Sequence, residues 1–97
     1  MLKITLACAG GMSSSLLVKR LEQAAQAIDL EISVRAIGQG RIAQYREETD
    51  ILLIAPQVKY TFKGTQKQFP DLKMMVIESR SYGMMDAEKI LQAALAL

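Results

Sequence analysis

The stretch from Leu6 to Leu16 constrains the fold of this chain more than any other. It starts as an apolar strand, passes through the small residues Cys8 to Gly11, and reaches three serines, Ser13 to Ser15, where a helical pattern begins. Serine is a preferred N-cap because its oxygen accepts a hydrogen bond from a backbone N–H that the helix leaves unpaired. Glycines let successive N–H groups converge, and a helix N-terminus adds partial positive charge. The stretch therefore predicts a strand, an anion-binding loop and a helix, with a thiol beside the anion.

The rest of the chain alternates short apolar runs with segments of helical spacing. The predicted strands are Leu2–Ala7, Glu31–Ile37, Ile51–Ala55 and Leu72–Ile77. The predicted helices are Ser13–Ile28, Arg41–Glu48, Gln57–Phe69 and a last helix that Asp86 caps, preceded by a polar loop over Glu78–Met85. Short parallel strands joined by right-handed helical crossovers form a sheet with helices on both faces. We expect an α/β fold in one domain over residues 1–97, with a four-stranded parallel sheet in the order 2-1-3-4 and a phosphate-binding loop after strand 1.

Apolar residues at helical spacing predict which helix faces are buried. The first helix presents Leu17, Leu21, Ala24 and Ile28, and the last presents Ala87, Ile90, Leu91, Ala94 and Leu95. The helices between them are expected to bury Ile42 and Tyr45, and then Val58, Phe62, Thr65 and Phe69. Met74 and Met75 of the fourth strand are expected in the core.

The strand order also predicts where a ligand binds. In open parallel sheets, ligands bind beyond the carboxyl ends of the strands, where the direction of winding reverses. Here that point lies between the first and third strands. The loop from Cys8 to Ser14 is expected on one side of it, and Ala55-Pro56-Gln57 on the other. Fold and motif therefore point to the same place.

The composition excludes several classes of protein. The 97 residues include 12 basic and 10 acidic side chains, and a net charge of +2 argues against a dedicated nucleic-acid binder. A single cysteine forms no internal disulfide, which indicates a reducing compartment. A signal peptide and an apolar run of about 20 residues are both absent, so we expect a cytoplasmic protein without membrane insertion. The lack of histidine excludes a Cys-His dyad and a phosphohistidine on this chain. We expect no metal and no cofactor.

Cys8 is the candidate nucleophile. A thiolate attacks phosphorus, and the oxygens of a phosphoryl group on the sulfur can accept the N–H groups of the loop. The same donors stabilise the charge that spreads over these oxygens during transfer. Alternatively, Cys8 is a small buried hydrophobic residue, as free cysteine commonly is. Its position at the end of a central strand, ahead of two glycines and three serines, favours the functional interpretation.

Other chemistries that use a similar loop require residues that this chain lacks. Cysteine phosphatases carry Cys-x5-Arg, in which the arginine grips phosphate as a planar fork. Ser14 occupies the arginine position here, so that fork is missing. The chain has no Gly-Lys-Ser/Thr, which a Walker P-loop requires, and no second cysteine, which a dithiol motif requires. Beside a phosphoryl carrier, two interpretations stay open: a non-catalytic anion-binding or regulatory module and, less favoured, a cysteine phosphatase.

These residues resemble the enzyme IIB component of the bacterial phosphotransferase system (PTS), of the lactose/cellobiose (chitobiose, β-glucoside) type. The resemblance spans essentially the whole chain and rests on Cys8–Val18, Leu53–Gln57, Ile77–Ser79 and Tyr82-Gly83. It implies a phosphotransferase that accepts a phosphoryl group from phosphohistidine of enzyme IIA onto Cys8. It further implies that the group passes to a sugar, expected to be a β-disaccharide, which the membrane enzyme IIC binds during uptake.

The resemblance also assigns roles to other residues. It implies that the phosphate is bound by Ala9, Gly10, Gly11, Met12, Ser13, Ser14 and Ser15. Gly10 takes a place that is often alanine, so this loop is expected to be more flexible.

Further residues are expected near the site or facing a partner: Pro56, Gln57, Arg80, Tyr82 and Gly83. For Arg80 the alternative is a solvated loop arginine, and for Tyr82-Gly83 it is an ordinary turn. Met12, Met84 and Met85 form an adaptable contact surface or, alternatively, fill the core. A monomer is expected, and the sequence does not identify the sugar.

Overall fold

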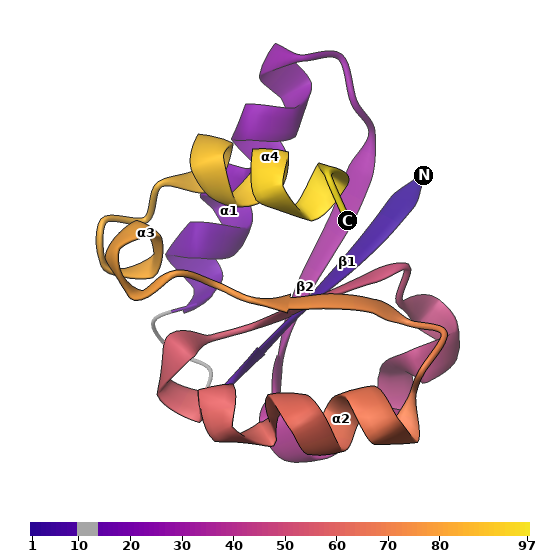
Figure 1. Ribbon diagram of the computed structural model, residues 1–97. Helices are drawn as coiled ribbons and strands as arrows, with labels where there is room; N and C mark the ends of the chain where they lie inside the picture. Colours follow the sequence, from indigo (N-terminus) through magenta and orange to yellow (C-terminus); the bar gives the residue numbers. More distant parts are fainter. Residues whose placement is uncertain (10–13) are drawn as a thin grey trace.

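The computed structural model describes residues 1–9 and 14–97, without the side chain of Ser14. Its centre is a parallel sheet in the order β2-β1-β3-β4, formed by β1 (Leu2–Cys8), β2 (Ile32–Gly38), β3 (Ile51–Ile54) and β4 (Lys73–Val76). Helices lie on both faces of this sheet (Figure 1). The predicted α/β class, strand order and parallel pairing are confirmed.

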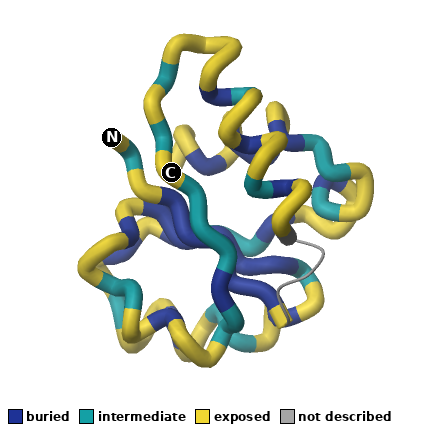
Figure 2. Tube along the Cα trace, turned by 180° about the vertical axis from the view of Figure 1, so that it is seen from behind, coloured by how far each residue is buried: buried dark blue, intermediate teal, exposed yellow. Residues whose placement is uncertain are grey.

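The two central strands are the most deeply buried part of the chain. β1 is buried from Ile4 to Cys8, and all of β3 is buried, which Figure 2 shows as dark blue tubes crossing the molecule. Near-continuous apolar strands are typical of parallel sheets covered on both faces. The edge strand β2 is mostly half-buried, in agreement with its alternating sequence. β4 is shorter than predicted, because Leu72 and Ile77 lie outside it although both are buried.

α1 (Ser14–Ala27) and α4 (Ala87–Leu95) cover one face of the sheet. They form a cluster of buried side chains with the strands below them; from these two helices it includes Leu17, Leu21, Ala25, Ala87, Ile90, Leu91 and Ala94. Each fully buried leucine or isoleucine contributes about 1.5–3 kcal/mol relative to its exposed state. This first cluster confirms most of the two predicted helical stripes.

Three members of those stripes are not fully buried. Ala24 is half-buried, Ile28 is 58% exposed and Leu95 is 42% exposed. α1 ends at Ala27, and Asp29 adopts the left-handed conformation with φ 55°. The N–H of Leu30 then donates to the carbonyl of Ala25 at 2.9 Å, which closes the helix end. Ile28 was wrongly placed in the core because the helix ends before it.

The other face is covered by shorter segments. They are η1 (Gln39–Arg41), η2 (Ala43–Glu48), η3 (Pro56–Thr61) and α2 (Phe62–Gln68), where η marks a 3-10 helix. The first helix predicted here, Arg41–Glu48, is instead formed by 3-10 segments. The second is 3-10 up to Thr61 and is interrupted where Val58 takes φ −119°. The predicted inward residues still pack correctly: Ile42, Val58 and Thr65 are buried, and Tyr45, Phe62 and Phe69 are half-buried against a second cluster.

The predicted loop over Glu78–Met85 is wrong, because Ser79–Gly83 forms the short helix α3. Ser81 is buried, and its hydroxyl donates to Oε1 of Glu78 at 3.1 Å. The same carboxylate forms an ion pair with Lys89 of α4 at 3.4 Å. Met85 ends the helix in the left-handed conformation with φ 51°. The segment is helical although it has no apolar periodicity of its own, and the ion pair links it to α4.

Asp86 caps α4 as predicted. Its Oδ1 accepts a hydrogen bond from the N–H of Lys89 at 3.3 Å, which satisfies one of the free donors at a helix start. Among the residues that the structure describes, no helix has the length and apolarity to cross a membrane.

Candidate functional site

The site is built on the carboxyl edge of the sheet, which we define as the edge where all four strands end. Cys8 is the last residue of β1 and pairs with Gly38, the last residue of β2. Its thiol donates a hydrogen bond to the carbonyl of Ile37, with a distance of 3.4 Å between sulfur and oxygen. Cys8 is 3% exposed and belongs to the second cluster. The candidate nucleophile therefore starts from a fixed position at the end of a central strand.

The turn after β3 lies directly beside the end of β1. The N–H of Ala55 donates to the carbonyl of Ala7 at 2.9 Å, which places Ala55 next to the residue that precedes Cys8. Pro56 is half-buried at the start of η3, where its fixed φ suits the first helical position, and Gln57 is exposed. The structure thus brings together the ends of the first and third strands.

Only part of the predicted phosphate loop lies in the described structure. Ala9 is exposed directly after β1, and Ser15 is exposed in the first turn of α1. Gly10, Gly11, Met12, Ser13 and the side chain of Ser14 lie outside the described residues. The backbone of Ser14 starts α1, a helix of 14 residues whose N-terminus carries partial positive charge. An anion-binding loop at this place stays a prediction.

The segment after β4 supplies the residues singled out around Tyr82. Tyr82 is half-buried and packs against both clusters, including the one that contains Cys8. Arg80 and Gly83 are exposed. A Cβ atom at Gly83 would meet no heavy atom within 4 Å, so packing does not require glycine there. Of these three residues, Tyr82 is the one whose side chain reaches the core beneath the site.

The methionines divide between core and surface. Met74 is buried in the second cluster, and Met75 is half-buried against the first. Both therefore pack in the core, as predicted. Met85 also packs against the first cluster, whereas Met84 is 64% exposed. Met84 can accordingly serve as a contact residue, and Met85 is a core residue.

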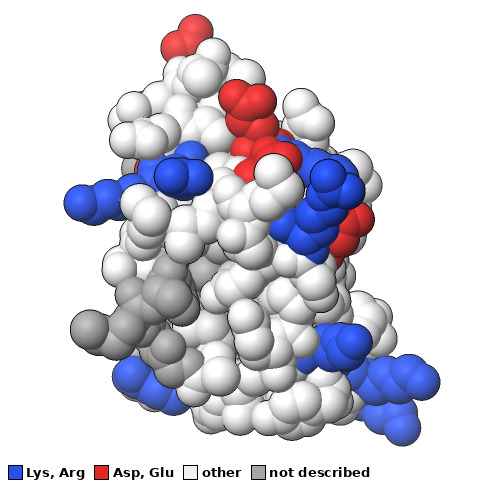
Figure 3. Space-filling view, turned by 90° about the vertical axis from the view of Figure 1, so that its left-hand side faces the viewer, with Lys and Arg blue, Asp and Glu red and all other residues white. Residues whose placement is uncertain are grey.

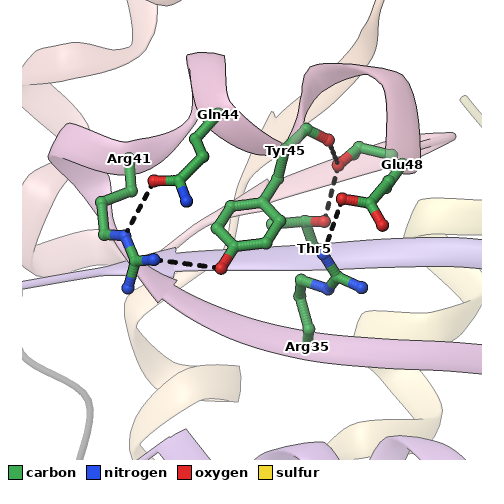
Figure 4. Close-up of polar contacts among 7 residues, drawn as sticks. Thr5, Arg35, Arg41, Gln44, Tyr45 and Glu48 are labelled. Atoms are coloured by element: carbon green, nitrogen blue, oxygen red, sulfur yellow. Dashed lines mark hydrogen bonds and ion pairs between the residues drawn. The ribbon is translucent and has the colours of Figure 1, made fainter.

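The sequence interpretation gave no role to a polar network above the second face. Figure 4 shows the ring of Tyr45 between Arg35 and Arg41, whose guanidinium carbons lie 4.6 and 5.4 Å from the ring centroid. Arg41 donates to the hydroxyl of Tyr45 at 3.1 Å and to Oε1 of Gln44 at 3.2 Å. The i,i+3 and i,i+4 spacing of these residues is the signal that could have revealed the contacts. Arg41 is thereby held at the carboxyl edge.

No group of three or more histidine, cysteine, aspartate or glutamate side chains is arranged to hold a metal ion within the described part of the chain. Among the described residues, the carboxyl edge carries one thiol, the strand ends, exposed cations and the carboxylate of Glu78, which is paired with Lys89. Figure 3 shows this side of the molecule, where lysines and arginines lie around an area of uncharged atoms and acidic side chains are grouped with cations in the upper part of the view. Such an arrangement can receive an anionic group.

The comparison with protein families decides the assignment. Residues 3–93 match the family described as "PTS system, Lactose/Cellobiose specific IIB subunit". This chain belongs to that family. The predicted resemblance is confirmed, and with it the classification of this IIB subunit as a phosphotransferase component of sugar transport.

Curated relatives support the family assignment along the whole chain. The oligo-beta-mannoside-specific EIIB component of Bacillus subtilis (strain 168) is 37% identical over 99 residues, which cover 100% of this chain and 96% of the relative. The cellobiose-specific EIIB component of Lactococcus lactis subsp. lactis (strain IL1403) is also 37% identical, and the match covers 94% of this chain and 91% of the relative. The galactose-specific component of L. lactis subsp. cremoris (strain MG1363) is 36% identical, with the same coverage.

Solved structures agree with the fold. The cellobiose-specific IIB component from Borrelia burgdorferi superposes with a TM-score of 0.80 at 32% identity, covering 98% of this chain and 89% of that one. The lactose-specific IIB domain from Streptococcus pneumoniae gives a TM-score of 0.84 at 20% identity, covering 98% of this chain and 95% of that one. The second likeness concerns the fold alone.

Proposed function

We propose that this IIB subunit carries a phosphoryl group on Cys8. In this proposal, residues 1–97 act as one cytoplasmic, monomeric IIB domain. Enzyme IIA donates the group from a phosphohistidine, and the membrane enzyme IIC presents the sugar that finally receives it. The observation that supports the proposal most strongly is the position of the only cysteine at the carboxyl end of β1, beside the turn at Ala55.

The first transfer is a displacement at phosphorus. The sulfur of Cys8 attacks, an S–P bond forms, and the P–N bond of the donor's phosphohistidine breaks. The thiol proton, which is donated to the carbonyl of Ile37 in the structure, leaves the sulfur, and the imidazole nitrogen that loses the phosphoryl group takes up one proton. In the second transfer a sugar hydroxyl attacks phosphorus, the S–P bond breaks, and the hydroxyl proton returns to the sulfur. No group on this chain other than Cys8 changes its covalent bonds.

The remaining site residues bind and position the group in this proposal. The segment from Ala9 to Ser15 supplies backbone N–H groups for the phosphoryl oxygens, assisted by the N-terminus of α1. Pro56 and Gln57 line the approach from β3, and Tyr82 supports the site from α3. The absence of histidine fits the role, because the histidine belongs to the donor.

We propose a β-disaccharide as the sugar and assign the choice of sugar to enzyme IIC. Three relatives of this chain that are 36–37% identical to it carry the names of three different sugars or sugar classes. Overall similarity within the IIB subunit therefore does not separate these sugars.

Sugar phosphorylation with Cys8→Ser tests the proposal. In a reconstituted system with phosphoenolpyruvate, the general PTS proteins, IIA and IIC membranes, we expect this variant to lower the rate of sugar phosphate formation about 1,000-fold or more. Serine can still donate to the carbonyl of Ile37, so the fold is expected to remain, as circular dichroism and urea unfolding will show. Undiminished sugar phosphorylation would favour the non-catalytic module, and turnover of an aryl phosphate by the wild type would favour a phosphatase.

A further inference from the structure

Charged residues bracket three of the four strands with opposite signs. Glu31 precedes β2 and Arg41 follows it; Asp50 precedes β3 and Lys59 follows it; Asp71 precedes β4 and Arg80 follows it. All six side chains belong to exposed residues. Because the strands are parallel, the three cations share the carboxyl edge, and the three carboxylates share the opposite, amino edge. Glu78 also follows β4 but is paired with Lys89, and the cations Lys3 and Lys73 lie at the amino edge. Arg41, Lys59 and Arg80 therefore form a group of exposed cations at the edge that holds Cys8.

The three cations are not neutralised by the described ion pairs. Within residues 1–9 and 14–97, the ion pairs are Arg35–Glu48 and Lys89–Glu78. Neither pair includes Arg41, Lys59 or Arg80. Arg41 is held in place by its two hydrogen bonds to neutral groups (Figure 4), so its charge remains directed at solvent. The N-terminus of α1 adds partial positive charge at the same edge.

Large apolar side chains are also exposed on the segments that follow the strands. Leu16 lies in the first turn of α1 and is 47% exposed, Tyr60 lies on η3 and is 76% exposed, and Met84 follows α3 and is 64% exposed. These segments follow β1, β3 and β4 respectively. Protein interfaces combine an apolar centre, in which tyrosine and methionine are enriched, with a polar rim. The carboxyl edge offers both components.

We propose that Arg41, Lys59 and Arg80 form a docking rim for an acidic surface around the phosphohistidine of the donor protein, an inference that rests on the proposed function. The donor is the partner that the charge fits, because it brings a phosphoryl dianion to this edge, whereas the sugar is uncharged. Complementary charge accelerates encounter by about 10- to 1,000-fold at low ionic strength. After transfer, a phosphoryl group on Cys8 adds roughly −1.5 to −2 charges at the edge, which weakens the attraction and favours release of the donor.

Two matched triple variants test the rim. The rim variant is Arg41→Gln/Lys59→Gln/Arg80→Gln, and the control is Lys3→Gln/Lys67→Gln/Lys73→Gln, which removes the same charge from exposed residues outside the rim. The second-order rate of phosphoryl transfer from phosphorylated IIA is measured by rapid quench at low and high salt. We expect about a tenfold or larger decrease for the rim variant at low salt, a weaker salt dependence, and less than about a twofold change for the control.

Other outcomes overturn the proposal in distinguishable ways. Equal decreases in both variants would show that net charge, and not its placement, governs the encounter. An unchanged rate in the rim variant would show that the rim does not contact the donor. In both cases the wild type still becomes phosphorylated, so the proposed function survives. A wild type that takes no phosphoryl group from any family donor would overturn the proposed function and this inference together.

Discussion

The two faces of the sheet are packed differently. Between the sheet and α1 and α4, the buried side chains are apolar, among them Leu6, Leu21 and Ile90. The opposite face, covered by 3-10 segments, also includes the buried hydroxyls of Thr5 and Thr49. Cys8 packs with the cluster on that second face. The hydroxyl of Thr49 donates to the carbonyl of Tyr45 at 2.7 Å, so the hydroxyl of Thr5, also at 2.7 Å, donates to Thr49. The comparison shows that buried apolar side chains stabilise the packing on the first face, whereas the packing on the second face also depends on hydrogen bonds between buried polar groups.

The largest effect is expected on the first face. Leu21 is fully buried, and Leu21→Ala should lower the free energy of unfolding by about 3 kcal/mol through lost burial and a cavity. Urea unfolding measures this loss. Leu16→Ala is the matched control on the same helix, because Leu16 is 47% exposed, and its effect should be about 0.5 kcal/mol or less. Equal effects of the two variants would contradict the described packing of α1.

A smaller effect is expected from the polar pair on the second face. Thr49→Val keeps the shape but leaves the hydroxyl of Thr5 and the carbonyl of Tyr45 without this partner, at a cost of about 2 kcal/mol. Thermal and urea unfolding measure the cost, and Thr49→Ser, which keeps the hydroxyl, should recover part of it. If Thr49→Val left the free energy of unfolding unchanged, the two faces would not differ in the way described.

The cap of α4 ranks next. Asp86→Ala removes the oxygen that accepts from the N–H of Lys89, and the expected loss is about 1 kcal/mol. Asp86→Asn retains a side-chain acceptor and should lose less. A loss as large as that of Leu21→Ala, measured in the same urea series, would indicate that polar contacts also dominate the first face.

The smallest effect is expected from the ion pair between Arg35 and Glu48 on the second face. Their side chains are 38% and 55% exposed and the atoms lie 3.3 Å apart, so water screens the attraction. Glu48→Gln should change the unfolding free energy by about 0.5 kcal/mol or less. Glu47→Gln is the neighbouring control. A loss above about 1 kcal/mol that disappears at high salt would show that charge contributes more to the second face than the exposure of this pair suggests.

The same contrast explains what could be predicted from the sequence. The strands and the packing under α1 and α4 follow from apolar runs and helical spacing, which are local signals, and the strand order was predicted with the rule that crossovers between parallel strands are right-handed. Ile28 was misplaced because the left-handed residue Asp29 ends α1 earlier than the apolar pattern does. α3 was missed because its polar residues show no apolar spacing; its Ser81–Glu78 hydrogen bond is local, and the exposed pair Glu78–Lys89 links it to α4.

One feature of the candidate site was predicted from the sequence, and another was not. The position of Cys8 at the end of a central strand could be predicted, since the apolar run before it and the glycines after it mark the strand end. The charge of the carboxyl edge was not predicted, although the predicted parallel strands already place three cations after their ends. Arg41, Lys59 and Arg80 lie in three separate segments, and only the parallel sheet brings their charges to one edge.

The central claim is that Cys8 carries the phosphoryl group, and the intact mass of the chain tests it most directly. The wild type and Cys8→Ser are each incubated with phosphoenolpyruvate, the general PTS proteins and IIA, and then weighed by mass spectrometry. The account predicts that the wild type gains the mass of one phosphoryl group, only when IIA is present, and that Cys8→Ser gains none. A phosphorylated Cys8→Ser variant, or a wild type that stays unmodified with every family donor, would contradict it.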